Sequence, residues 1–256
     1  MIFAEKKEYE YYKQFFPKLT EKTENWKLSD CCFDSPIAQA KFIINRRNNP
    51  TAAAVLMGDF IFCFGTADKI FLSEAVAGRE SLILMTPQDG WGEAAKQLFC
   101  KSRAYLRYSF SLSLGLGIYK TDEKPLPVGT ELVPIEESWF YQCRKEEWMR
   151  DFCSQFADFS EYQRYGMGFL LLKDGKPVSG ASSYLVSRSG FTIQVQTREE
   201  EQGKGYAFYV CKVLIFCALK EGKYPDWDAD NETSARLAQR LGYNLEKSYP
   251  VILIQR

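Results

Sequence analysis

Residues 195–207 carry the sequence VQTREEEQGKGYA, from which much of the architecture can be inferred. Residues 191–197, which include the start of this stretch, predict a strand. The apolar residues of 205–220 have the spacing of an amphipathic helix. Gly203 and Gly205 lie in the turn between them. The first N–H groups of a helix lack partners within the helix, and the helix dipole favours negative charge there. The segment therefore predicts an anion site suited to phosphate, with a plain strand-to-helix turn as the alternative.

The same turn matches a phosphate-binding pattern that differs from the P-loop. It lacks G-x-x-x-x-G-K-[ST], and it fits Gln/Arg-x-x-Gly-x-Gly/Ala through Gln202, Gly205 and Ala207. With this motif the sequence resembles the GNAT superfamily of N-acetyltransferases, whose members use it to hold the pyrophosphate of acetyl-CoA.

A second motif of that superfamily follows one strand and one helix later. It consists of an Asn, a small residue three positions on, an apolar residue, and a Gly followed by an aromatic residue: Asn231, Ser234, Leu237, Gly242 and Tyr243. The resemblance covers about residues 127–256. The Trp-Asp pair before Asn231 resembles, more narrowly, the subfamily of the zwittermicin A resistance proteins, which carries an extra N-terminal domain.

The resemblance implies how acetyl-CoA binds. Its pantetheine arm is expected between the strand ending at Thr197 and the strand 224–230, hydrogen-bonded to backbone like an added strand. The pyrophosphate is expected on the backbone amides of 203–207, with the Lys204 ammonium adding charge. For Ser234, an ordinary place in the first helical turn is the alternative. The implied cofactor-binding residues are Val195, Gln196, Thr197, Gln202, Gly203, Lys204, Gly205, Tyr206, Ala207, Asn231 and Ser234.

Acetyl transfer to an amine needs a neutral amine, a donor to the developing oxyanion and a proton for the leaving thiolate. The resemblance implies a backbone N–H within 195–197 as the oxyanion donor. Because the chain has no histidine, carboxylates are the candidate bases, and we select Glu199 and Asp228 as candidate catalytic residues. A solvated turn and a strand end are the alternatives for these two. The neighbouring candidates are Glu200, Asp226 and Asp230, the two aspartates sharing a strand face with Asp228 by alternation.

Ala238 marks a departure from the superfamily. Many GNAT enzymes carry a tyrosine seven residues after the Asn to protonate the thiolate, and Ala238 stands there in this chain. A thiol pKa near ~8.5 lets solvent supply the proton, and Tyr206, Tyr243 and Tyr249 are alternative donors. The predicted function is N-acetyl transfer from acetyl-CoA to a primary amine of a small molecule by direct attack. The alternative is a non-catalytic acyl-CoA-binding or regulatory module with a decayed active site.

The composition restricts the partners. Lys plus Arg and Asp plus Glu number 33 each, so the zero net charge argues against a nucleic-acid or anionic-membrane binder. It also weakens a third alternative, transfer from aminoacyl-tRNA. The absence of histidine excludes Cys-His and Ser-His nucleophile pairs and imidazole zinc sites, and the cysteines lack C-x-x-C spacing, so no metal is expected. A charged N-terminus and short apolar runs predict a cytoplasmic protein with reduced thiols; a homodimer is left open.

The expected fold class is α+β with two domains. An N-terminal α+β domain of unknown role is expected at 1–124, and a GNAT-like domain with a central mixed, mostly antiparallel sheet flanked by helices at 125–256. The boundary lies in the polar, proline-containing segment 120–127. No motif decides whether the first half is a second copy of the same fold.

Individual elements are expected from periodicity and turn residues. In the first half these are a helical stretch at 36–46, a hairpin of 52–57 with 60–64, an amphipathic helix at 91–99 and a half-buried strand at 103–114. In the second half, strands are expected at 131–135, 168–173, 177–186, 191–197, 224–230 and 245–254, and helices at 136–143, 145–156, 205–220 and 232–241.

Overall fold

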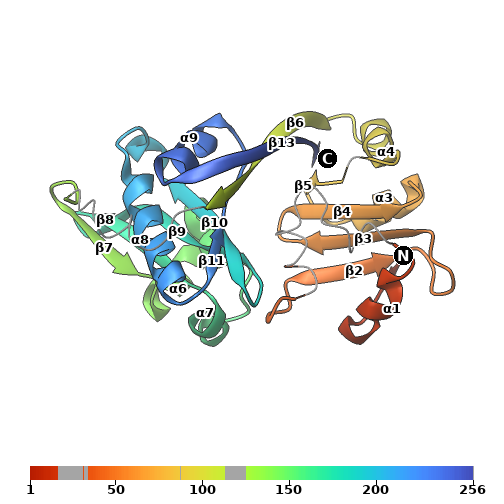
Figure 1. Ribbon diagram of the computed structural model, residues 1–256, viewed down its shortest axis with the longest axis horizontal. Helices are drawn as coiled ribbons and strands as arrows, with labels where there is room; N and C mark the ends of the chain where they lie inside the picture. The colour runs from red at the N-terminus through yellow and green to blue at the C-terminus, as the bar shows by residue number, and fades with distance from the viewer. Residues whose placement is uncertain (17–30, 32–33, 87, 113–124, 256) are drawn as a thin grey trace. The chain divides into compact units, whose positions relative to one another are not determined.

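The computed structural model describes residues 1–16, 31, 34–86, 88–112 and 125–255 (Figure 1). The chain forms two compact units, one of Met1–Arg107 with Ser248–Arg256 and one of Tyr108–Lys247. It passes between them in β6 (Arg103–Leu112) and again in β13 (Tyr243–Gln255). Both units combine sheets with helices, so the expected α+β class is confirmed.

The first unit is built on the first six strands of the eight-stranded sheet β1-β2-β3-β4-β5-β13-β6-β12. Strands β3 (Ala52–Met57) and β4 (Phe60–Gly65) form the expected hairpin, with Met57 opposite Phe60. β4 runs parallel to β5, and the other pairs among these six strands are antiparallel. The remaining elements are β1 (Ile2–Phe3), η1 (Lys6–Glu8), α1 (Tyr9–Lys13), β2 (Ala40–Ile44), α3 (Lys69–Ala75), β5 (Ser81–Leu84) and α4 (Trp91–Leu98).

Helices α3 and α4 pack together and supply the large side chains of this unit's core. Trp91 is buried, with its ring 6.2 Å from that of Phe71. Ile252 and Ile254 of β13 belong to the same hydrophobic cluster as these two residues. The last strand of the chain is therefore part of the core of the first unit.

The helical stretch expected at 36–46 is wrong. Residues 40–44 form β2, which pairs with β1 on one side and β3 on the other. Phe42, Ile43 and Ile44 are buried there. Pairing on both sides satisfies the strand's backbone, and packing of β-branched side chains outweighs the local helical pattern.

The strand expected at 103–114 forms as β6 over its described residues, but its first part does not bury the apolar face. Leu106 is 49% exposed, whereas Arg107 is only 6% exposed. The Arg107 guanidinium lies 5.2 Å from the ring centre of Phe60, and this stacking allows a charged residue to take the inward position.

The second unit contains a five-stranded sheet of order β11-β10-β9-β8-β7. β10 and β11 are parallel and the other pairs antiparallel, so the expected mixed, mostly antiparallel sheet is confirmed. Of the predicted helix 145–156, residues 147–152 form a 3-10 helix, η3, and the sequence did not predict α7. The elements are β7 (Thr130–Pro134), α6 (Glu137–Lys145), η3 (Glu147–Phe152), α7 (Phe159–Tyr165), β8 (Gly168–Lys173), β9 (Lys176–Val186), β10 (Gly190–Thr197), η4 (Glu199–Glu201), α8 (Tyr206–Lys220), β11 (Tyr224–Asp226), β12 (Asp228–Ala229) and α9 (Glu232–Arg240).

The single strand expected at 224–230 is divided in two at Trp227. β11 pairs with β10, while β12 turns away and pairs with β6, where Asp228 lies opposite Ser109. Because the two pieces belong to different sheets, the sheet of β10 opens at this point.

The same order of elements occurs in both units. In each, three antiparallel strands precede a helix, a strand parallel to the third, and a second helix: β2-β3-β4-α3-β5-α4 and β8-β9-β10-α8-β11-α9. The strand that follows then pairs outside its own half of the sequence. Tyr108 and Ser109 of β6 pair with β12, and residues 252–255 of β13 pair with β5. Each unit thus contains a strand from the other half of the sequence.

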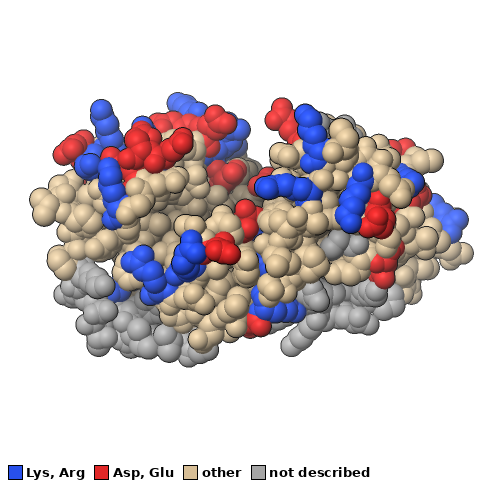
Figure 2. Space-filling view, turned by 90° about the horizontal axis from the view of Figure 1, so that it is seen from above, with Lys and Arg blue, Asp and Glu red and all other residues tan. Residues whose placement is uncertain are grey.

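The predicted boundary between 124 and 125 stays a prediction, because residues 113–124 lie outside the described part. The compact units differ from that division in that residues 108–112 go with the second unit and 248–255 with the first. Figure 2 shows basic and acidic side chains interspersed over the visible face, as a chain of zero net charge allows.

Candidate functional site

Strand β10 has one open edge. On one side it pairs with β9 as far as Thr197, which lies opposite Ser179. On the other side its pairing with β11 stops at Thr192, opposite Asp226. From residue 193 onward, this second edge is paired with no strand in the described part of the chain. An unpaired edge of this kind can accept an extended ligand as an added strand.

The backbone groups at this edge can be assigned from the hydrogen bonds of the other edge. The Arg198 N–H donates to Val178 O at 2.9 Å, and Gln196 O accepts from Ser179 Oγ at 3.2 Å, so the even-numbered residues point toward β9. Alternation directs the amides of Val195 and Thr197 to the open edge. Both belong to the predicted cofactor-binding set.

The turn after β10 leaves a helix N-terminus uncovered. Gly203 and Gly205 have φ values of 76° and 81°, and Gly205 is the N-cap of α8 without a side-chain cap. The N–H groups of 203–207 donate to no acceptor among the described residues, whereas Phe208 donates to Gly205 O. A Cβ built on either glycine would enter open space. The turn therefore has the free donors and the room that a pyrophosphate needs.

Glu201 links two lysines beside this turn, Lys173 and Lys204. Its carboxylate lies 2.7 Å from Lys204 Nζ and 3.4 Å from Lys173 Nζ. The hydrogen bond from Lys204, with a smaller contribution from Lys173, holds the pKa of Glu201 below its usual value, and Glu201 raises the pKa of Lys204. The Lys204 charge predicted to face the pyrophosphate is thus shared with a carboxylate of its own loop.

Gln202, the first residue of the first motif, supports the turn directly. Gln202 Nε2 donates to Thr197 O at 3.3 Å, which connects the turn to the end of β10. In this arrangement the Gln202 side chain joins the strand to the loop.

The second motif forms the N-terminus of α9. Asn231 is the N-cap, and its Oδ1 accepts from the Ser234 N–H at 3.0 Å. Ser234 Oγ accepts in turn from the Trp227 indole N–H at 3.2 Å. Both predicted contact residues therefore have structural roles here, and Asn231 can offer a ligand its side-chain NH2 group.

The two candidate catalytic carboxylates lie on separate elements. Glu199 begins η4 and is exposed, while Asp228 lies half-buried in β12. The shared face expected for Asp226, Asp228 and Asp230 rested on one continuous strand, and this is wrong because the strand breaks at Trp227. Asp226 is buried and Asp230 exposed.

The position of Ala238 is fully buried in α9. Of the tyrosines considered as substitutes, Tyr243 donates its hydroxyl to Pro225 O at 2.6 Å, and Tyr249 belongs to the first unit. Tyr206 is the first residue of α8 and is 7% exposed. Of the three, Tyr206 is therefore the residue that directly follows the glycine turn.

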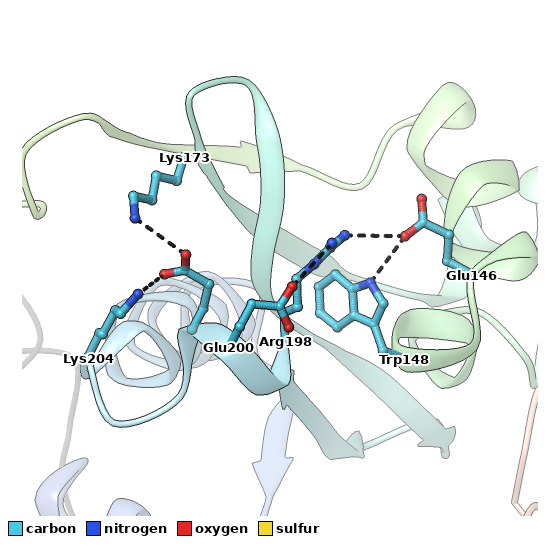
Figure 3. Close-up of polar contacts among 7 residues, drawn as sticks. Glu146, Trp148, Lys173, Arg198, Glu200 and Lys204 are labelled. Atoms are coloured by element: carbon cyan, nitrogen blue, oxygen red, sulfur yellow. Dashed lines mark hydrogen bonds and ion pairs between the residues drawn. The ribbon is translucent and has the colours of Figure 1, made fainter.

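Sequence reasoning missed a cluster at the end of β10. Arg198 lies 5.4 Å from the ring centre of Trp148, whose indole N–H donates to Glu146 at 3.1 Å (Figure 3). Arg198 stood within the quoted motif segment, but nothing in the sequence linked it to η3.

The equivalent turn of the first unit does not offer such a site. A Cβ on Gly65 would overlap Thr51 O, and the N-cap of α3 is Asp68, whose carboxylate accepts from the Phe71 N–H at 3.0 Å. A carboxylate at that helix N-terminus occupies the donors and repels phosphate. An open turn with free N–H groups, as at residues 203–207, is thus a property of the second unit.

Comparisons with known proteins agree with this geometry. A model of the GNAT acetyltransferase family matches residues 19–252. An uncharacterized N-acetyltransferase of Bacillus subtilis, YdfB, is 26% identical over 189 residues, which are 71% of this chain and 69% of that protein.

Solved structures also match nearly the whole chain. A GCN5-related N-acetyltransferase-like protein from Streptococcus suis has a TM-score of 0.84 and 27% identity, covering 95% of this chain and 99% of that one. A tandem GNAT protein from the clavulanic acid biosynthesis pathway shares the fold, with a TM-score of 0.54 and 12% identity over 99% of this chain and 97% of that one. In the described part of the chain, no helix has the length and apolarity to cross a membrane.

Proposed function

Since the chain belongs to the GNAT acetyltransferase family, we propose that it transfers the acetyl group of acetyl-CoA to a primary amine of a small molecule by direct attack. The open edge of β10 beside the uncovered N-terminus of α8 carries this proposal. Acetyl-CoA supplies an acetyl group activated as a thioester. The neutral amine nitrogen bonds to the acetyl carbon as the carbon–sulfur bond breaks. The proton released from the nitrogen passes to water, and the departing CoA thiolate takes a proton from solvent.

The residues of this chain then have the following roles. The amides of 203–207 bind the pyrophosphate, and the edge of β10 binds the extended arm of acetyl-CoA. The Val195 or Thr197 N–H stabilises negative charge on the acetyl oxygen. Asn231 and Ser234 contact the cofactor from the start of α9. Glu199 and Asp228 are the proposed bases that attract the ammonium and take its proton through water.

The cofactor site is tested with three glycine variants. Gly205→Asp places a carboxylate at the pyrophosphate, and Gly205→Asn places a neutral side chain of the same size at the same strained φ. Gly175→Asp repeats the strain and the charge in the β8–β9 turn, where φ is 73° and the space is also open.

Titration calorimetry with acetyl-CoA, CoA and NAD checks the outcome. We expect micromolar binding of acetyl-CoA but not of NAD, loss of at least about 100-fold in Gly205→Asp, a smaller loss in Gly205→Asn, and none in Gly175→Asp. Unchanged acetyl-CoA affinity in a folded Gly205→Asp protein would refute the assigned site.

A second candidate function is favoured by Ala238, which removes the family's usual proton donor. A protein that binds acyl-CoA without transferring it would give the same calorimetric result. Thiol release from acetyl-CoA in the presence of an amine separates the two: transfer predicts amine-dependent release, and a binding module predicts none. The cytoplasmic location, the homodimer and the narrower resemblance to zwittermicin A resistance proteins stay predictions.

A further inference from the structure

Arg198 has a guanidinium with unused hydrogen-bonding capacity. Its Nε is buried without a partner among the described residues, and its two Nη atoms are each 3.6 Å from a carboxylate oxygen, one of Glu146 and one of Glu200. Both contacts are ion pairs, at separations that exceed hydrogen-bond length. Arg144, by comparison, donates to two backbone carbonyls at 2.7 and 3.1 Å. A guanidinium carries five N–H donors, so Arg198 is much less satisfied than its neighbour in the same unit.

The same side chain is nevertheless held in place. Its guanidinium lies over the Trp148 ring at 5.4 Å, and its own N–H is fixed to β9. Glu146, which lies 3.6 Å from one Nη atom of Arg198, accepts from Trp148 Nε1 at 3.1 Å and from Gln142 Nε2 at 3.2 Å. Figure 3 shows Arg198 between Glu146 and Glu200, with the indole beside it. The donors of Arg198 are thus preorganised, which lowers the entropy cost of binding an anion.

The cluster adjoins the proposed transfer site. Gly180 and Ser182 of β9 face η3, since a Cβ on Gly180 would meet the Phe152 ring and Ser182 Oγ donates to Phe152 O. Gln196 and Gln194 lie opposite these two residues and therefore share that face. Arg198 continues the alternation and reaches Trp148 of η3. Arg198 follows directly after Thr197, the last residue of β10.

The charges around Arg198 restrict what can bind there. Two carboxylates flank one guanidinium, so a simple anion would be attracted by Arg198 and repelled by Glu146 and Glu200. A molecule with both a carboxylate and an ammonium group finds an opposite charge for each. We propose that the amine acceptor is a small zwitterion, an amino acid or related amino-carboxylate, whose carboxylate is bound by Arg198.

This inference rests on the acetyl transfer proposed above and names its acceptor class. The carboxylate accepts two parallel hydrogen bonds from the guanidinium, the geometry that an arginine fork favours. The carboxylates of Glu146 and Glu200 attract the ammonium group of the same molecule. The amine to be acetylated then lies toward the amides of Val195 and Thr197.

The test uses pairs of amines that differ only by a carboxylate: L-lysine with cadaverine, L-ornithine with putrescine, and L-tyrosine with tyramine. Each is titrated calorimetrically into protein saturated with CoA, and each is assayed for thiol release with acetyl-CoA. At least one carboxylate member is expected to bind, and to give a kcat/KM, about 10- to 100-fold better than its partner.

Variants connect the preference to Arg198. Arg198→Met is expected to abolish the preference by raising KM for the carboxylate member, with the affinity for acetyl-CoA unchanged. Arg198→Lys keeps the charge but loses the fork and is expected to restore part of the preference. Arg164→Met is the matched control, because Arg164 also stacks on an aromatic ring, that of Tyr165 at 5.2 Å, and has no place in the proposed site.

Two results would overturn the inference: no carboxylate-dependent binding in any pair, or a preference that Arg198→Met leaves intact. Failure of the proposed function looks different. In that case an amino acid binds in an Arg198-dependent manner, and no thiol is released.

Discussion

At the residue scale, Asn231 combines two roles that a single substitution to Ala would confuse. Its Oδ1 caps α9, and its NH2 group is the part available to acetyl-CoA. Asp at this position keeps the capping oxygen and removes the donor, because Asp and Asn are comparable N-caps. The pair of substitutions therefore separates helix stability from cofactor binding.

Asn231→Ala is expected to lower the free energy of unfolding by about 0.5–2 kcal/mol, and Asn231→Asp by much less. Both are expected to weaken acetyl-CoA binding several-fold. Urea unfolding and titration calorimetry measure the two effects. Asp158→Ala, which removes the N-cap of α7, is the control for cap loss alone. Normal acetyl-CoA affinity in Asn231→Asp would remove Asn231 from the cofactor site.

The ion pairs of Glu201 make the stability of the fold depend on pH, with a sign that follows from the shift of its pKa. Its pKa is held below 4.5 by Lys204 and Lys173, so the stabilisation from these ion pairs is fully present above pH 4.5 and is lost as pH falls through the lowered pKa. A carbon-13 NMR titration of the glutamate carboxyl groups should place the Glu201 midpoint below 4.5. Lys204→Met should raise this midpoint. A midpoint that stays the same in Lys204→Met would contradict the ion pair between Glu201 and Lys204.

At the element scale, the opening between β10 and β11 depends on a glycine. Gly190 begins β10 opposite Tyr224, and a Cβ there would overlap Tyr224 O. The parallel pairing at 190–192 holds the two strands together at one end, so that they part at the other. Any side chain at 190 must displace β11, which leads to the start of α9.

Gly190→Ala is therefore expected to destabilise the fold by about 1–3 kcal/mol and to weaken acetyl-CoA binding. Thermal and urea unfolding measure the first effect, and calorimetry the second. Gly175→Ala, at φ 73° with open space around it, gives the cost of backbone strain without displacement. If Gly190→Ala proved no less stable than Gly175→Ala, the packing of β10 on β11 would be looser than described.

Elements with a strong local pattern could be predicted from the sequence. Helix α8 and the hairpin β3–β4 have continuous periodicity or a Gly-Asp turn, and both form where expected. Strand β2 and the break at Trp227 could not be predicted, because partners distant in the sequence, β1 with β3 and then β6, determine them. Gly203 and Gly205 could be identified as candidate site residues from their positions in the turn between a predicted strand and a predicted helix. The Arg198–Trp148 contact joins residues from two elements, and a single sequence gives no signal for it.

At the scale of the whole molecule, each compact unit takes a strand from the other half of the sequence. Residues 252–255 pair with β5 in the first unit, and Tyr108 and Ser109 pair with β12 in the second. Ile252 and Ile254 are also part of the first unit's core. The division of the sequence at 124/125 therefore does not yield two complete sheets.

Fragments 1–124 and 125–256, expressed separately, are each expected to lack cooperative unfolding, since each exposes apolar surface and an unpaired strand edge. Mixed together, they should recover a single transition and acetyl-CoA binding. Circular dichroism during urea titration, followed by calorimetry, checks both statements. Cooperative unfolding and acetyl-CoA binding by 125–256 alone would show that β6 is dispensable.

The exchanged strands also set an order of events during synthesis. β5 and its parallel neighbour β4 are made early, but the strand that pairs with the other edge of β5 is made only when the ribosome has translated residues 252–255. At ordinary elongation rates the delay is on the order of 10–30 s. Throughout it the first half of the nascent chain presents an apolar strand edge to the surrounding medium. We therefore expect the protein to depend on chaperones during translation, and we expect this dependence to fall if the last strand is moved next to β5 by circular permutation.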